Sequence, residues 1–312
     1  MMKKAGICIL SGAVIAILGA GLFTYTTLRG ATGYHSDWLN VGFFPYDEWQ
    51  IADDTEEFHS AEYAVSSLEP EPARIKSWDG CRYLSAEIDH AELVLNGGAD
   101  WGITLSGISE DELEFQNDDG HTYLRIDGDA LSDSVTKRIV TLTIPDYLKE
   151  AQLNTVVGSI SIRNLKIDTL TAYNIGNILL EDVQSESCGL SCDSGDITLT
   201  DTTAAWLNAQ TNAGSIDIQN SAFQSTTLSA DTGNIRFSGN PGDFSFYTDT
   251  GSVDLSIDGT RNDYLISAET SVGSITAFGV RINGTDTSFG SDNARYSGSI
   301  ETDIGSITVS DE

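Results

Sequence analysis

The sequence predicts an all-β fold, a parallel β-helix or β-solenoid with coils of 18–22 residues, preceded by one N-terminal transmembrane helix. Three observations support this prediction: a glycine that recurs at nearly fixed spacing, alternation of apolar and polar residues on both sides of it, and an uncharged stretch near the N-terminus. The recurring glycine indicates stacking, because a repeat of this length can bury its apolar side chains only against neighbouring repeats.

The uncharged stretch covers residues 5–28 and follows Lys3 and Lys4. Its 24 residues would span roughly 36 Å as a helix, enough to cross the apolar core of a lipid bilayer. We therefore expect a single-pass anchor in the cell membrane, with residues 1–4 in the cytoplasm and the bulk of the chain outside. A cleaved signal peptide is the alternative, because small residues at 19–21 follow an apolar run.

Two segments separate the anchor from the regular repeats. Residues 29–72 contain Gly, Pro, acidic clusters and scattered aromatics without a lasting period, which favours an extracytoplasmic linker. Residues 73–145 contain short β-type runs separated by turn signals such as Asp119-Gly120. We expect this second segment to be an irregular β capping region for a regular solenoid over residues 146–312, because stacked repeats need a cap at each open end.

Within the repeats, an Asp or Asn two positions before the glycine predicts a tight corner. Such a side chain can bond its own backbone in an Asx turn, and glycine reaches φ > 0 without a steric penalty. The predicted turn ladder consists of Asn174, Asp193, Asn212, Asp231, Asp249 and Asp303 with Gly158, Gly176, Gly195, Gly214, Gly233, Gly251, Gly273 and Gly305. The position three before the glycine holds small residues such as Cys192, Ala230 and Thr248, which we expect to face inward.

The charge balance excludes one class of partner. After residue 29 there are 13 basic and 47 acidic residues, a formal charge of −34. This field repels phosphate backbones, so we predict no nucleic-acid binding. Carboxylates that keep an exposed surface soluble account for the charge without a dedicated cation site, although weak calcium binding by the Asp column stays open.

No catalytic motif is present in the sequence. There is no Gly-x-Ser-x-Gly, no His-Glu-x-x-His and no phosphate loop, so we predict no enzyme activity, catalytic residue, cofactor or metal. Asp231 and Asp249 could in principle serve sugar hydrolysis, but Asn replaces Asp in the same column, and a turn accepts either residue. Cys188 and Cys192 are predicted to pack in the core, and a disulfide between them would require a bend at Gly189.

The interval between Gly273 and Gly305 breaks the period. Insertions in solenoids fall on loops and often on the binding face, so we expect exposed partner-binding side chains here. The candidates are Asn283, Asp286, Phe289, Asp292, Arg295 and Tyr296.

The run Val140-Thr-Leu-Thr-Ile-Pro145, the stretch 153–160 and the serial Asp-x-Gly-x-Ile coils resemble the putative adhesin family of bacterial β-strand-repeat proteins. The resemblance covers about residues 73–310 and implies a β-solenoid in the cell envelope, with no catalytic residues to carry over. The expected function is a membrane-anchored, non-enzymatic, adhesin-like surface interaction module with an unidentified protein or glycan partner. An accessory sensor or regulator of envelope stress and a polysaccharide-active β-helix enzyme are the alternatives.

Overall fold

The structure is a computed structural model and describes residues 73–75, 80–127, 137–145 and 147–311. The anchor expected at 5–28 and the linker expected at 29–72 lie outside these residues. Within the described part, no helix is long and apolar enough to cross a membrane. That part consists of β-strands and two short 3-10 turns, η2 (Glu110–Glu112) and η3 (Arg261–Asp263). The prediction of an all-β fold is confirmed.

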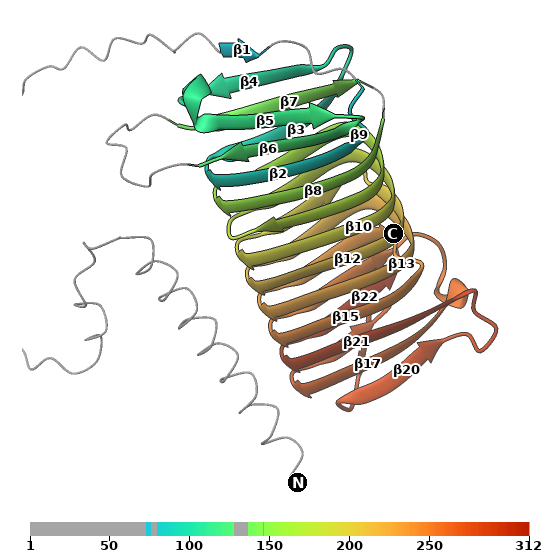
Figure 1. The fold of residues 1–312 in the computed structure, drawn as a ribbon. Coiled ribbons are helices and arrows are strands. Elements are labelled where there is room, and N and C mark those ends of the chain that lie inside the picture. Colours follow the sequence, from blue (N-terminus) through green and yellow to red (C-terminus); the bar gives the residue numbers. More distant parts are fainter. Residues whose placement is uncertain (1–72, 76–79, 128–136, 146, 312) are drawn as a thin grey trace, which may run out of the picture. The chain divides into compact units, whose positions relative to one another are not determined.

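Residues 148–257 wind into a regular stack of parallel coils (Figure 1). Residues pair with partners 18 or 19 positions further along the chain, as Ile160 does with Ile178 and Ile178 with Ile197. The predicted β-solenoid is therefore present. Its strands are β8 (Leu148–Val157), β9 (Ile160–Asn174), β10 (Ile178–Ser194), β11 (Ile197–Thr200), β12 (Thr203–Ala213), β13 (Ile216–Thr232), β14 (Ile235–Asn240), β15 (Asp243–Thr250) and β16 (Val253–Ile257).

Each coil contains three straight segments, as the burial pattern of β9 shows. Inward-facing residues alternate along β9, but the alternation changes phase at 163–164 and again at 168–169. The first phase change coincides with a residue in the left-handed region, with φ between 50° and 53° in four successive coils. These residues are Asn164, Asp182, Asp201 and Asn220. Asn and Asp tolerate this conformation best among residues with a side chain, so an Asn or Asp corner exists here, away from the glycine.

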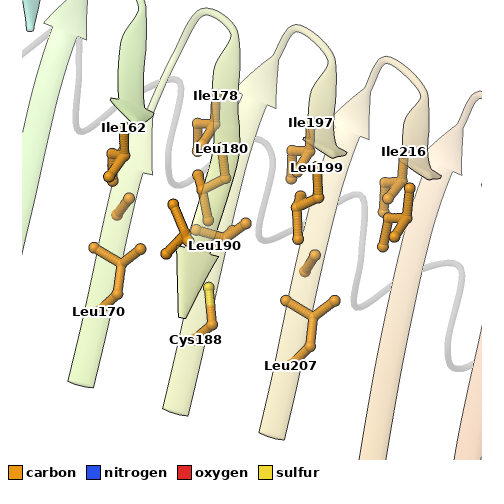
Figure 2. Packing of buried hydrophobic residues seen from close by; sticks show 14 of the residues in the cluster. Ile162, Leu170, Ile178, Leu180, Cys188, Leu190, Ile197, Leu199, Leu207 and Ile216 are labelled. Atoms are coloured by element: carbon orange, nitrogen blue, oxygen red, sulfur yellow. The ribbon is translucent and has the colours of Figure 1, made fainter. Parts of the chain in front are cut away.

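The core is a set of buried columns, because each coil places a buried side chain at the same position as the coil before it. Figure 2 shows two such columns, Leu170 with Cys188 and Leu207, and Ile178 with Ile197 and Ile216. All six side chains are at most 3% exposed. Cys188 and Cys192 are both buried and free, so the structure contains no bridge between them, and burial raises the pKa of the Cys188 thiol to about 12.

The order of coils in space differs from their order in the sequence at both ends of the stack (Figure 1). The coil of β2 (Tyr83–His90) and β3 (Glu92–Gly98) lies between β8–β9 on one side and β6 (His121–Ile126) with β7 (Ile139–Pro145) on the other. The coil of β21 (Tyr296–Ile304) and β22 (Ile307–Asp311) lies between β15–β16 and β17 (Tyr264–Val272) with β18 (Ile275–Ala277). At each end, therefore, one coil is inserted between two others.

Antiparallel strands close both ends of the stack. At one end these are β5 (Leu113–Asp118) on β6, β4 (Gly102–Ser106) on β7, and β1 (Ala73–Ile75) on β4. At the other end they are β20 (Asp286–Gly290) on β17 and β19 (Val280–Ile282) on β18. Charged exposed residues such as Glu114 on β5 and Asp286 on β20 discourage further edge pairing.

Candidate interaction surface

The recurring glycine is required where neighbouring coils touch. A Cβ added to Gly233 would lie 1.7 Å from the carbonyl oxygen of Gly214, and one added to Gly251 would lie 1.8 Å from that of Gly233. The φ of +153° at Gly233 adds a conformational reason. The sequence analysis predicted glycine at the corners from its freedom to adopt φ > 0. That reason is incomplete, because Gly251 does not have a positive φ and is instead required by the close approach of the neighbouring coil.

The polar residue that follows each glycine links one coil to the next. The backbone N–H of Asp196 donates to Asn177 Oδ1 at 2.9 Å, and that of Ser215 donates to Asp196 Oδ1 at 2.7 Å. The N–H of Ser252 likewise donates to Asn234 Oδ1 at 2.9 Å. These bonds satisfy corner amides that the strands leave unpaired.

A buried hydroxyl column lies three residues before the glycine. Thr248 donates to the Gly233 carbonyl at 3.0 Å, and Thr302 donates to the Gly251 carbonyl at 2.9 Å. Asn174 belongs to this column and not to the exposed turn ladder: it is 0% exposed, aligned with Cys192, and donates to the Gly158 carbonyl. Its predicted place in the ladder is wrong, because the coil at Gly176 is shifted by one residue relative to the next.

The remaining Asp and Asn residues of the predicted turn ladder point outward and form a column. Asn212 donates to Asp193 at 3.3 Å, and the hydroxyl of Tyr173 donates to the same carboxylate at 2.6 Å. Asp249 accepts a hydrogen bond from Tyr247. Two of these carboxylates thus bind tyrosine hydroxyls on the outer surface. Burial and the bond to Asp193 raise the pKa of Tyr173 to about 12.

The predicted partner-binding insertion is part of the solenoid end. Phe289 in β20 is only 8% exposed and contacts Phe278 edge to face at 6.0 Å between ring centroids. Tyr296 is half-buried against Tyr264 at 5.3 Å, and the guanidinium of Arg295 lies over the Tyr296 ring. The expectation that these two aromatic rings are free is therefore wrong. Asn283, Asp286 and Asp292 are exposed, and their role in partner binding stays a prediction.

One long continuous surface is the outer side of twelve strands that pair in one series. We call it the long face; in spatial order it comprises β5, β6, β2, β8, β9, β10, β12, β13, β15, β21, β17 and β20. In β9, β10 and β13 the long face uses only the C-terminal part of the strand. Because strand residues alternate in direction, every second residue of these segments points outward and aligns with its counterparts in a column.

Aromatic side chains stand on the long face at several points. Near β5, the rings of Tyr83 and His121 are stacked at 4.4 Å, beside a groove of about 460 Å³ that Tyr123 and Gln152 also line. Trp206 stands in the middle of β12 and is 53% exposed. Trp206 was not among the residues singled out from the sequence, although counting back from the inward Thr211 in steps of two marks 207 as inward and 206 as outward.

From Trp206 toward the C-terminal ends of the strands, the long face carries no charge over several residues. Residues 169–173, 187–191, 206–210 and 225–229 lie side by side on β9, β10, β12 and β13, and none of them is Asp, Glu, Lys or Arg. We call their outward side chains the neutral patch. Uncharged side chains over four adjoining strands are unexpected in a chain with 47 acidic residues. The patch is bordered by acids such as Asp168 and Asp193.

A protein of known structure has the same kind of fold. A putative adhesin from Bacteroides fragilis is similar with a TM-score of 0.50 and 16% identity, over 76% of this chain and 95% of that chain. A putative cell adhesion protein from Clostridium sporogenes aligns with a TM-score of 0.29 and 13% identity, over 78% of this chain and 100% of that chain. The search of the curated proteins gives no match. The Toastrack DUF4097 family matches residues 103–310, two thirds of the sequence, and the chain therefore belongs to that family.

Proposed function

We propose that the protein is a non-enzymatic, adhesin-like interaction module, held at the outer side of the cell membrane by residues 5–28. The observation that carries this proposal is the long face, a broad surface built from paired strands. Its backbone is fixed by inter-coil hydrogen bonds and by the corner bonds described above, so its side chains emerge from constant positions. A partner that binds such a surface orders few protein groups on binding, which reduces the entropic cost.

Three further points support this function. The Bacteroides fragilis neighbour of known structure is itself described as a putative adhesin. The strongly acidic surface keeps an exposed protein soluble. Asp193 and Asp249, which belong to the column considered for sugar hydrolysis, are engaged by tyrosine hydroxyls. These features favour a protein that binds its partner over one that catalyses a reaction on it.

The test compares cells that produce the full chain with cells that lack it, and with cells that produce a variant of the long face. The variant carries Thr171→Asp, Asn208→Asp and Thr227→Asp, and its matched control carries Thr200→Asp, Gln219→Asp and Thr308→Asp on the strands of another face. We expect adherence to fall without the protein and with the first variant, and to persist with the control. Unchanged adherence in cells lacking the protein contradicts the proposal, and a change in envelope-stress gene expression alone supports the sensor alternative.

A further inference from the structure

Trp206 offers an accessible indole on a rigid support. It is 53% exposed in the middle of β12, and the residues aligned with it on the adjoining strands are Ser187 and Ser225. Serine side chains are too short to cover an indole. An exposed tryptophan on a fixed backbone is the type of residue that contributes most to binding, because it buries a large area and loses little conformational entropy.

Gly189 lies diagonally beside Trp206, and the fold does not require a glycine there. A Cβ at this position would meet only the carbonyl oxygen of Leu170, at an ordinary 3.9 Å, and Gly189 is not among the glycines with positive φ. This contrasts with Gly233, where a Cβ collides with backbone. A glycine inside a strand weakens it, and often marks a place where a ligand approaches the backbone closely. Gly189 leaves a notch in the surface, about 8 Å from Trp206 by strand geometry.

The rest of the neutral patch supplies hydrogen-bonding groups without charge. Asn208 is exposed two residues from Trp206, and the amide of Gln210 donates to the hydroxyl of Ser191 at 3.1 Å. The patch measures roughly 14 Å along the stack and 13 Å along the strands, from the usual strand spacing and rise. The matching ligand has a flat apolar surface for the indole, hydroxyl groups for the amides and hydroxyls, and no negative charge, because the bordering carboxylates repel anions.

We propose that Trp206 and Gly189 form a binding site for a neutral glycan, in which one pyranose ring stacks on the indole and a neighbouring ring lies over the notch. This proposal rests on the proposed interaction function and names the class of its partner. A glycan meets the requirements because a pyranose ring has a C–H surface that packs on an aromatic ring and hydroxyls around its edge. The neutral patch contains no Asp or Glu that could cleave a glycosidic bond, so the glycan is bound and not cleaved.

The test uses the full chain in mild detergent and two neutral probes, the hexamers of β-1,4-linked glucose and of β-1,4-linked N-acetylglucosamine, with polygalacturonate as the anionic comparison. Binding is measured by calorimetry and by tryptophan fluorescence. We expect at least one neutral hexamer to bind, Trp206→Ala to weaken it by at least about tenfold, and Trp206→Phe to retain part of the affinity. Gly189→Gln fills the notch and should also weaken binding, while Tyr147→Ala, which removes an exposed aromatic outside the patch, should not.

Two results overturn the glycan site: no neutral hexamer binds, or Trp206→Ala and Tyr147→Ala bind equally well. Unfolding curves of Trp206→Ala and Gly189→Gln show whether a loss of affinity reflects loss of structure, and the site is rejected if only unfolded variants lose binding. Adherence of the producing cells separates this proposal from the one on which it rests. Adherence that depends on the long face but not on Trp206 rejects the glycan site alone, whereas adherence independent of the protein rejects both.

Discussion

At the scale of single residues, the corner of each coil depends on contacts with the corner of the next. The glycine leaves room for a neighbouring carbonyl, the residue after it accepts a neighbouring N–H, and the residue three before it donates to a neighbouring glycine carbonyl. Each contact joins successive coils, so a change at one corner acts on two coils.

Gly233→Ala tests the close approach. The added Cβ would lie 1.7 Å from the Gly214 carbonyl oxygen at φ +153°, so we expect a loss of roughly 1–3 kcal/mol in the free energy of unfolding. Gly189→Ala is the matched control, because its Cβ meets only ordinary contact, and it should be neutral or slightly stabilising. Equal losses in chemical denaturation would show that glycine is not required specifically at the corner.

The buried hydroxyl column gives a pair of opposite substitutions. Thr248→Val keeps the shape but leaves the Gly233 carbonyl without its donor, and should cost about 1–3 kcal/mol. Ala230 is aligned with Thr211 and Thr248 in the same column but carries no donor. Ala230→Thr should therefore stabilise by up to about 1 kcal/mol, by bonding the Gly214 carbonyl. Thermal unfolding checks both, and destabilisation by Ala230→Thr would mean that the space at this coil is too small.

At the scale of elements, the solenoid could be predicted from the sequence and the arrangement of its ends could not. Glycine spacing and alternating apolar residues reflect local geometry, so they identify coils and inward positions. The coil at Gly305 has the same Asp-x-Gly-x-Ile pattern as its neighbours. No local signal therefore shows that Thr302 in this coil pairs with Thr248, 54 residues earlier. The burial of Phe289 follows from the pairing of β20 with β17, which the period does not contain.

Ending the chain after Gly290 tests this arrangement. The truncation removes β21 and β22 and leaves β15 and β17 without their shared partner. We expect loss of protection in β17 to β20, whereas β15 and β16 keep their partners β13 and β14. Deletion of residues 73–75 is the control, because β1 pairs with β4 at the outermost position and its loss should cost little. Hydrogen exchange measures both. Retained protection in β17 after truncation would show that β17 does not depend on β21.

At the scale of the whole molecule, a sequence with 47 acidic residues contains a neutral patch whose four strand segments carry no Asp, Glu, Lys or Arg. The prediction of a highly acidic exterior follows directly from composition, whereas the patch depends on which residues the coils align. Trp206 could have been placed outward from its distance to Gly214, but its uncharged neighbours come from 187–191 and 225–229, one coil away in the sequence on either side.

The stacked carboxylates give a pH-dependent prediction. Burial, and then the charge of Asp249, raise the pKa of Asp231. The ionised form is thus disfavoured in the folded state, so Asp231 lowers stability at pH 7, and this cost disappears as the pH falls through the raised pKa. Asp231→Asn should raise the melting temperature at pH 7, and its advantage should shrink in acid.

Asp100→Asn is the control for the change in net charge, because Asp100 is exposed and lies between β3 and β4 at the end of the stack. At pH 7 it should raise the melting temperature less than Asp231→Asn does. Melting curves over a series of pH values measure all three proteins. An advantage of Asp231→Asn that grows as the pH falls would contradict the assignment.

The inserted coil of β21 and β22 also restricts the order of events during synthesis. In a growing chain, β17 and β18 are made before β21 and β22. Yet β21 and β22 must lie between β15–β16 and β17–β18 in the finished stack. Coils 148–257 can stack as they emerge, but until residues 296–311 follow, β17 and β18 have only their antiparallel partners β20 and β19. Completion of the stack is thus a late event, and an interrupted chain exposes the parallel edges of β17 and β18 to proteases. The solenoid can grow coil by coil through its middle, but its C-terminal end is completed only when the last coil of the sequence has been made.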